Sequence, residues 1–294
     1  MNILITGFIG TALCAHLLNN GHRLTVYSRR PGQVPELCGE SVAALNHLQD
    51  LTTEDRFDAI INLAGEGIAD ARWTAARKQK LLDSRIGTTQ QLIAYMERAA
   101  HKPKVLISGS AVGFYGNQGD ALLDENSPAH DDFAHRLCAQ WEHTARQAEA
   151  SGVRVCIIRT GLVIGANGGF LKRMLPAFRF GLGGTLGSGK QWMSWIHRRD
   201  LLAVITLLLE TESLQGVFNG TAPNPVTNAE FTRCLARLVH RPVLLPVPAP
   251  VLKILLGELS ELLLGGQRVY PRRLQEMGFP FQFPTLESAL QDVL

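Results

Sequence analysis

The stretch that decides the fold is LITGFIGTAL, residues 4–13, close to the start of the chain. An apolar run leads into Thr6 and Gly7, and a helical pattern begins almost at once. This order predicts a strand, a tight turn and a helix, in which glycines let an anion approach backbone N–H groups. Two glycines alone also fit a turn without a ligand, so their place between strand and helix is what favours a nucleotide site. The residues predicted to face the nucleotide here are Gly7, Phe8, Ile9 and Gly10.

Short apolar runs alternate with longer amphipathic stretches through the first half of the chain. The runs predict strands at residues 2–6, 23–28, 59–63, 104–108 and 153–159, with a weaker one at 42–45. Helical patterns lie between them at 8–20, 72–99 and 132–150. Runs such as AIINLAG and KVLISGS are apolar throughout, which is typical of strands covered on both faces. The alternation predicts an α/β fold built on a doubly wound parallel sheet with right-handed crossovers.

The composition is that of an ordinary globular protein. Hydrophobic residues make up 46% of the 294 residues, and the net charge of +3 is too small to indicate a nucleic-acid partner. The five cysteines form no CxxC pair, so reduced thiols are favoured over metal ligands. No signal peptide is evident, and the longest apolar run, residues 201–209, is shorter than the ~20 residues of a membrane span. We expect a cytoplasmic monomer or homodimer that binds no metal, membrane or nucleic acid.

The second predicted strand ends in Ser28, Arg29 and Arg30, about twenty residues after the glycine turn. An NAD site usually places an Asp or Glu here to accept a hydrogen bond from the ribose 2′-hydroxyl. Guanidinium groups match a phosphate in a bidentate manner, whereas a carboxylate would repel it. The sequence therefore favours NADP(H) over NAD, although two exposed arginines at a strand end are the simpler alternative.

Small and hydroxyl-bearing residues follow two further predicted strands. Leu63, Ala64 and Gly65 end one of them, and their small side chains allow a cofactor ring or ribose to lie against the backbone. Ser108 and Ser110 end the next, with Gly113-Phe114-Tyr115 close behind. Hydroxyls at the carboxyl end of a strand beside a nicotinamide are candidates to hydrogen-bond a substrate oxygen. Serine and glycine are also common in loops, so each residue alone carries little weight.

Taken together, these motifs carry a resemblance to a known family. TGxxG at the N-terminus, NLAG, the serine strand end followed by FYG, and IRTGLVIG resemble an extended short-chain dehydrogenase/reductase. Longer motifs resemble the atypical "epimerase family" of sugar-nucleotide-epimerase-like proteins: NLAGEGIADARW (62–73), SRIGTT (84–89), FGLGGTLGSGKQWMSWIHRRDLL (180–202), FNGTAPNPVTNAEF (218–231) and GGQRVYPRRLQEMGF (265–279). The likeness covers essentially the whole chain.

The resemblance implies a Rossmann fold with a smaller mixed C-terminal lobe, and NADP(H) as the ligand. By position, Ser28 and Arg29 correspond to contacts of the 2′-phosphate, and Arg85 to a partner of the pyrophosphate. Leu63 and Ala64 correspond to the strand end on the adenosine side of the cofactor. Thr160, Gly161 and Leu162 correspond to residues that line the nicotinamide.

The composition of the sequence changes after about residue 165, where glycine becomes frequent and apolar runs typical of strands become rare. We predict an NADP(H)-binding Rossmann domain over 1–165, to which a later segment, about 195–220, can return. Residues 166–294 are predicted to form the smaller lobe, with helices at 199–210 and 227–239. Such a lobe can supply a substrate pocket at the carboxyl ends of the strands.

The chain departs from the family pattern where proton transfer is expected. Active relatives carry a Tyr-x-x-x-Lys pair, in which the lysine lowers the pKa of the tyrosine. Here the tyrosine position falls on Phe133 or Ala134, and the lysine position on Leu137 or Cys138. Ser110 and Tyr115 are the remaining catalytic candidates, and weaker ones are His135, His197, Glu66 and Lys190.

Two functional readings follow from this departure. One is an NADP(H)-dependent oxidoreductase or epimerase that acts on a small polar, sugar-like substrate, with Ser110 polarising the substrate oxygen. The other is a non-catalytic NADP(H)-binding protein with a redox-sensing or structural role, which the missing pair favours. A third reading, a scaffold protein that binds no cofactor, is the least favoured, because it would not explain Arg29 and the NLAG strand end.

The glycine turn is a second departure. Relatives typically read Thr-Gly-Gly-Thr-Gly-Phe-Ile-Gly, whereas this chain reads Thr-Gly-Phe-Ile-Gly and is shorter by three residues. Either the loop is truly shorter, which would damage cofactor affinity, or three mobile loop residues are missing from the printed sequence, which we favour. A Cα separation of about 3.8 Å between Gly7 and Phe8 would indicate a continuous chain.

Overall fold

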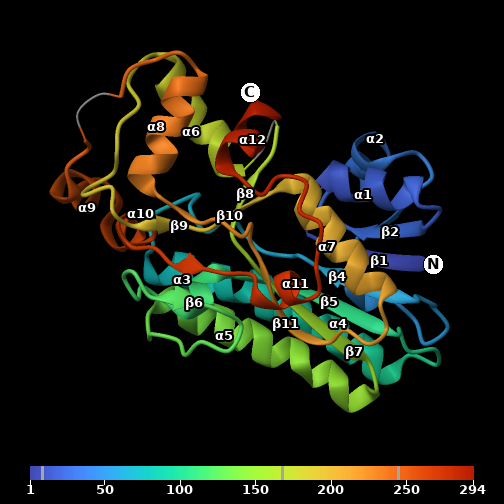
Figure 1. Ribbon diagram of the computed structural model, residues 1–294. Coiled ribbons are helices and arrows are strands. Elements are labelled where there is room, and N and C mark those ends of the chain that lie inside the picture. Colours follow the sequence, from blue (N-terminus) through green and yellow to red (C-terminus); the bar gives the residue numbers. More distant parts are fainter. Residues whose placement is uncertain (8–9, 167–168, 244–245) are drawn as a thin grey trace.

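The computed structural model describes residues 1–7, 10–166, 169–243 and 246–294. Within these ranges, seven strands form one parallel sheet in the order β11-β7-β5-β4-β1-β2-β3 (Figure 1). The strands are β1 (Asn2–Thr6), β2 (Arg23–Tyr27), β3 (Ala43–Leu45), β4 (Ala59–Asn62), β5 (Val105–Ala111), β7 (Arg154–Thr160) and β11 (Gly216–Gly220). The chain winds outward from β1 in both directions, which confirms the predicted Rossmann-type, doubly wound sheet.

Helices cover both faces of this sheet, as the continuous apolar strands predict. Ile3 and Ile5 of β1 belong to a core on one face, with α1 (Gly10–Asn19), α2 (Val34–Cys38) and α7 (Arg198–Glu210). Leu4, between them, points to the other face, where α4 (Thr88–Arg98) and α5 (Phe133–Arg146) pack. Successive strand residues point to opposite faces, so an apolar residue at every position is what a strand buried on both sides requires.

The helical pattern predicted over 72–99 is in fact two helices. The first, α3 (Ala75–Leu82), leads through a π-helical turn (Asp83–Gly87) into α4. Its first turn is capped by Thr74, whose hydroxyl accepts a hydrogen bond from the N–H of Arg77. A π turn widens the helix locally and is frequent at functional sites. This one lies at the carboxyl edge of the sheet, next to the strand ends with the predicted site residues.

A smaller lobe follows the sheet. Its core gathers Trp195, Phe178 and Phe231 with residues of α6 (Gly169–Arg179), α8 (Asn228–Leu238) and α12 (Leu286–Gln291). Three strand pairs accompany it: β8 (Leu162–Ile164) with β10 (Trp195–His197), β9 (Trp192–Met193) with β12 (Val226–Thr227), and β6 (Leu122–Leu123) with β13 (Arg268–Val269). The remaining helices are α9 (Ala249–Leu256), α10 (Glu261–Leu264) and α11 (Arg272–Glu276).

The two parts of the chain are interleaved. Strand β11 comes from the segment predicted to return to the sheet, and it pairs with β7 at the sheet edge. The carboxylate of Asp200 in α7 is buried and accepts hydrogen bonds from the backbone N–H groups of Gln282 and Phe283. These bonds join the sheet-covering helix α7 to the C-terminal segment. The domain boundary near residue 165 stays a prediction.

No helix in the described ranges combines the length and the apolar character that a bilayer crossing requires.

Candidate functional site

A cavity of about 770 Å³ lies at the carboxyl ends of β1, β2 and β4. The predicted cofactor-binding residues that line it are Gly7, Ser28, Arg29, Arg30, Ala64 and Gly65. Apolar side chains, among them Ile5, Val26 and Leu37, line other parts of its wall. Lys80 of α3 and Asp83 and Ser84 of the π turn line it as well. Residues from three strand ends and the α3–α4 region therefore meet in one space. Phe8 and Ile9, and hence the Gly7–Phe8 separation, lie outside the described residues.

Gly7 packs directly against the end of β4. Its φ angle is +86°, and a Cβ atom at this position would lie 2.2 Å from the carbonyl carbon and oxygen of Leu63. Both the positive φ and the close approach of two backbones exclude a side chain. The backbone at the start of the glycine turn is therefore in direct contact with the backbone of the NLAG strand end.

Replacing Gly7 by Ala is expected to lower the free energy of unfolding by about 2 kcal/mol, because backbone strain and overlap with Leu63 add together. Gly21→Ala is the matched control: its φ is +76° but no atom lies within 4 Å of the added Cβ, so only strain is introduced. Urea denaturation followed by circular dichroism measures both. Equal losses for the two variants would show that the contact with Leu63 does not matter.

A cluster of charges lies along one wall of the cavity. The guanidinium of Arg29 donates to Glu66 at 2.6 Å, and Arg77 reaches the other carboxylate oxygen at 3.3 Å. Lys80 lies 3.9 Å from the same carboxylate. The hydrogen bond from Arg29 lowers the pKa of the Glu66 carboxyl, and the bond from Arg77 adds to this. Because 80% of the Arg29 side chain is exposed, the guanidinium remains available to a second anion.

Arg85, expected at the pyrophosphate, lies beneath the strand end. Its guanidinium carbon would be 2.9 Å from a Cβ added to Gly65, and Nη2 donates to the carbonyl of Glu66 at 3.0 Å. The guanidinium also lies 5.4 Å from the ring centroid of Trp141. Burial lowers its pKa. Arg85 therefore supports the backbone of Gly65 and Glu66. It does not line the 770 Å³ cavity, and its contact with a pyrophosphate stays a prediction.

The predicted residues on β5 and β7 lie deeper in the fold. Ser108 is fully buried next to Asn62, its register partner on β4. Gly161 follows β7, and a Cβ there would lie 2.5 Å from the carbonyl oxygen of Ser194 in the second lobe. Thr160 and Leu162 flank it and are partly buried. These residues line neither of the two cavities described here, and their predicted place beside a nicotinamide remains untested.

Ser110 and Tyr115 meet in a buried polar network. Ser110 donates to Glu142 at 2.7 Å, and Arg159 holds the same carboxylate through Nε and Nη2 at 2.8 and 2.9 Å. The Tyr115 hydroxyl donates to Asn219 at 2.7 Å and accepts from Arg159 at 3.1 Å. Burial raises the pKa of Tyr115 to about 12. Both hydroxyls are engaged in the protein interior, so each would have to leave its partner to reach a substrate.

The helix positions that replace Tyr and Lys are apolar and packed. Ala134, Leu137 and Cys138 of α5 are buried, and Phe133 stacks edge-on against Trp73 with ring centroids 4.8 Å apart. Nδ1 of His135 donates a hydrogen bond to the carbonyl oxygen of Phe114, 2.6 Å away. Phe133, Ala134 and Leu137 carry no ionisable group, and burial raises the pKa of the Cys138 thiol to about 11.

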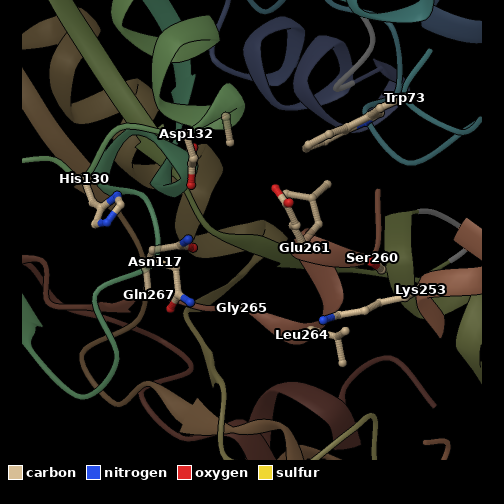
Figure 2. A pocket seen from close by; sticks show the side chains of 12 residues that line it. Trp73, Asn117, His130, Asp132, Lys253, Ser260, Glu261, Leu264, Gly265 and Gln267 are labelled. Carbon is tan, nitrogen blue, oxygen red and sulfur yellow. The ribbon is translucent and has the colours of Figure 1, made fainter. Parts of the chain in front are cut away.

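A second cavity of about 380 Å³ opens beside the start of α5 (Figure 2). Its walls come from the segment between β4 and α3, from the segment between β5 and α5, from the start of α5, and from residues 253–267 of the second lobe. The lining residues are Trp73, Asn117, His130, Asp132, Ala134, Lys253, Ser260, Glu261, Leu262, Leu264, Gly265 and Gln267. Sequence reasoning missed its polar residues. Only Asp132 carries a local signal, because it caps α5 by accepting from the N–H of His135.

A doubly wound sheet with a glycine turn after β1 and a cavity across the carboxyl strand ends defines the Rossmann class of dinucleotide-binding proteins. The sequence model of the NAD dependent epimerase/dehydratase family matches residues 5–219, and the chain belongs to this family. A domain of unknown function, DUF1731, matches residues 247–293. The resemblance seen in the sequence is thereby confirmed.

Several relatives match over nearly the full length. The epimerase family protein SDR39U1 of Bos taurus is 41% identical over 98% of this chain and 97% of its own. The crystal structure of human SDR39U1 (isoform 2) with NADPH superposes with a TM-score of 0.90 at 36% identity, covering 100% of this chain and 99% of that one. MoeE5 in complex with UDP-glucose and NAD has a TM-score of 0.78 at 19% identity, over 99% of this chain and 96% of its own, and shows the fold alone.

Proposed function

We propose that this protein binds NADP(H) in the 770 Å³ cavity and acts as an oxidoreductase or epimerase on a small polar substrate. The observation that carries the proposal is that Ser28, Arg29 and Arg30 line the same cavity as the glycine turn and the NLAG strand end. No carboxylate stands at the end of β2, so two guanidiniums face the place where a 2′-phosphate would lie.

The residues present fit the cofactor. Apolar side chains of Val26, Val34 and Leu37 offer a surface for the adenine ring, and Arg29 and Arg30 offer donors to the 2′-phosphate. The N-terminus of α1, which begins at Gly10, supplies backbone N–H groups and a positive dipole end for the pyrophosphate. The backbone of Gly7 can approach a ligand closely because it has no side chain. The human relative was crystallised with NADPH, which supports the same ligand here.

When bound, the nicotinamide supplies or accepts a hydride, and the protein has to position the substrate and handle one proton. Reduction of a carbonyl adds a hydride at carbon and a proton at oxygen, and oxidation of an alcohol removes both. Ser110 and Tyr115 stay our candidates for contact with the substrate oxygen. They would act after exchanging their bonds to Glu142 and Asn219 for bonds to the substrate.

A non-catalytic NADP(H)-binding role is the second candidate. The observation that favours it is the absence of Tyr and Lys at their usual positions on α5, together with buried hydroxyls of Ser110 and Tyr115 that are hydrogen-bonded to Glu142 and Asn219. In that role the cofactor would stabilise the fold or report the redox state.

Titration of the purified protein with NADPH and with NADH, followed by intrinsic fluorescence, tests the cofactor assignment. We expect NADPH to bind more tightly by at least about tenfold, since charged hydrogen bonds to the 2′-phosphate are worth about 1.5–3 kcal/mol. Equal affinities would overturn it. Oxidation of NADPH with a panel of small carbonyl compounds then separates the two candidates: turnover supports the enzyme, and tight binding without turnover supports the non-catalytic role.

A further inference from the structure

Helix α9 carries apolar residues on two sides. Leu252 is buried against the rest of the second lobe. Val251, Ile254 and Leu255 follow the i, i+3, i+4 spacing of one helix face, and all three are exposed. Solvent reaches 77% of Ile254, so this face packs against nothing within the described chain. An exposed apolar helix face of this kind marks a surface for contact with something outside the molecule.

A second segment extends the exposed apolar face. In the loop that follows α6, Leu182 is exposed and solvent reaches 81% of Phe180. The loop runs beside the segment that leads into α9, where the backbone N–H of Val247 donates to the carbonyl of Thr185 at 2.8 Å. Figure 1 shows the two segments, in yellow and orange, at the same end of the second lobe. Their exposed side chains therefore belong to one region of the protein surface.

The charge of this region is of one sign. We call it the lobe-end surface and define it as residues 172–190, 241–243 and 246–255. These residues include no Asp or Glu. Arg173 pairs with Asp70, and none of the other cations forms a salt bridge within the described ranges. The cations are Lys172, Arg173, Arg179, Lys190, Arg241 and Lys253.

We propose that the lobe-end surface binds the face of a lipid bilayer that contains anionic lipids. Phosphate headgroups attract clustered Lys and Arg, and aliphatic and aromatic side chains enter the boundary between headgroups and acyl chains. Protein–protein interfaces are depleted in Lys, whereas an anionic bilayer favours it. Neither of the two cavities described above is lined by Phe180 or Ile254, so these side chains protrude. A bilayer accepts protruding side chains without a matching pocket.

Contact of this kind needs no helix that crosses the bilayer. The expectation from the sequence that the protein has no membrane partner rested on the lack of an apolar run of ~20 residues. Peripheral contact depends instead on which side chains are exposed, and run length does not reveal that. Apolar insertion and charge act together, because either one alone gives only marginal, reversible binding.

Co-sedimentation of the full-length protein with lipid vesicles tests the proposal. One set of vesicles consists of phosphatidylcholine, and the other contains about 30% phosphatidylglycerol as the anionic lipid. We expect the affinity for the anionic vesicles to be at least about tenfold higher, and to fall at least about tenfold between about 0.1 M and 0.5 M salt.

Ile254→Glu and Phe180→Glu are each expected to weaken binding to the anionic vesicles at least about tenfold, because an inserted apolar side chain is replaced by an anion. Leu122→Glu is the matched control. Leu122 is 56% exposed on β6, outside the lobe-end surface, and this substitution adds the same charge. We expect it to change the affinity by no more than about twofold. Circular dichroism checks that all three variants are folded.

Three results with vesicles would overturn the proposal: no binding to the anionic vesicles, equal affinity for both kinds, or equal weakening by Leu122→Glu and Ile254→Glu. Light scattering without vesicles adds a fourth. A wild-type dimer that Ile254→Glu converts to a monomer would show that a second copy of the chain covers this surface, whereas an unchanged mass supports the bilayer. The vesicle experiment needs no cofactor, so its failure would leave the proposed function intact.

Discussion

Replacing Glu142 by Gln is expected to lower the free energy of unfolding by about 3–5 kcal/mol, because it leaves Arg159 charged and buried without a counter-ion. Both side chains are 5% exposed, and the carboxylate is held by two guanidinium nitrogens and by Ser110. Urea denaturation at neutral pH measures the loss. Glu149→Gln, which removes an exposed pair with Arg146, is the control and is expected to cost less than about 1 kcal/mol.

The double variant Glu142→Gln with Arg159→Met sharpens this result. Removing both charges leaves a neutral glutamine and a methionine in place of a buried ion pair, so part of the lost stability is expected to return. A decrease in the free energy of unfolding of less than about 1 kcal/mol in the single variant would mean that the Arg159 guanidinium is hydrated. Ser110 and Tyr115 would then lie closer to solvent than the structure shows.

Replacing Arg29 by Asp is expected to weaken NADPH binding about 100-fold, while the affinity for NADH changes only a few-fold. The reason is that Asp replaces a cation that lines the cavity by an anion that repels the 2′-phosphate. Glu66 keeps its hydrogen bond from Arg77 in this variant. Fluorescence titration with both cofactors measures the ratio of affinities.

Arg23→Asp is the control for this charge reversal. Arg23 is exposed at the opposite, amino-terminal end of β2, away from the cavity. We expect it to change neither affinity by more than about twofold, because screening removes long-range effects beyond about 10 Å. An equal loss of NADPH and NADH in the Arg29 variant would count against recognition of the 2′-phosphate.

The sheet was predictable because its signal is local. Most strands of the sheet are short runs of mainly apolar residues, and β1, β2 and β4 lie within one residue of their predicted ends. The break between α3 and α4 was missed, because the π turn changes the hydrogen-bond pattern without an interrupting proline. Helix α6 was missed as well, since it follows a glycine-rich segment and contains Pro176.

The two cavities also differ in how far their residues could be predicted from local sequence. The first is assembled from strand ends, whose carboxyl termini meet at one sheet edge in any doubly wound fold, so Gly7, Ser28 and Ala64 could be placed from the sequence. The second joins the segment around Asn117 to the segment around Gln267. These meet because β6 pairs with β13 across some 145 residues, a tertiary contact with no local signal.

The pairing of β11 with β7 has a consequence for how the chain is made. Strand β7 ends at Thr160, yet the strand that covers its outer edge begins at Gly216. During synthesis from the N-terminus, β7 therefore leaves the ribosome before its neighbour exists, with a row of backbone donors and acceptors open to foreign strands. The nascent sheet depends on the next sixty or so residues to close that edge, and a fragment that stops at residue 165 would carry it permanently.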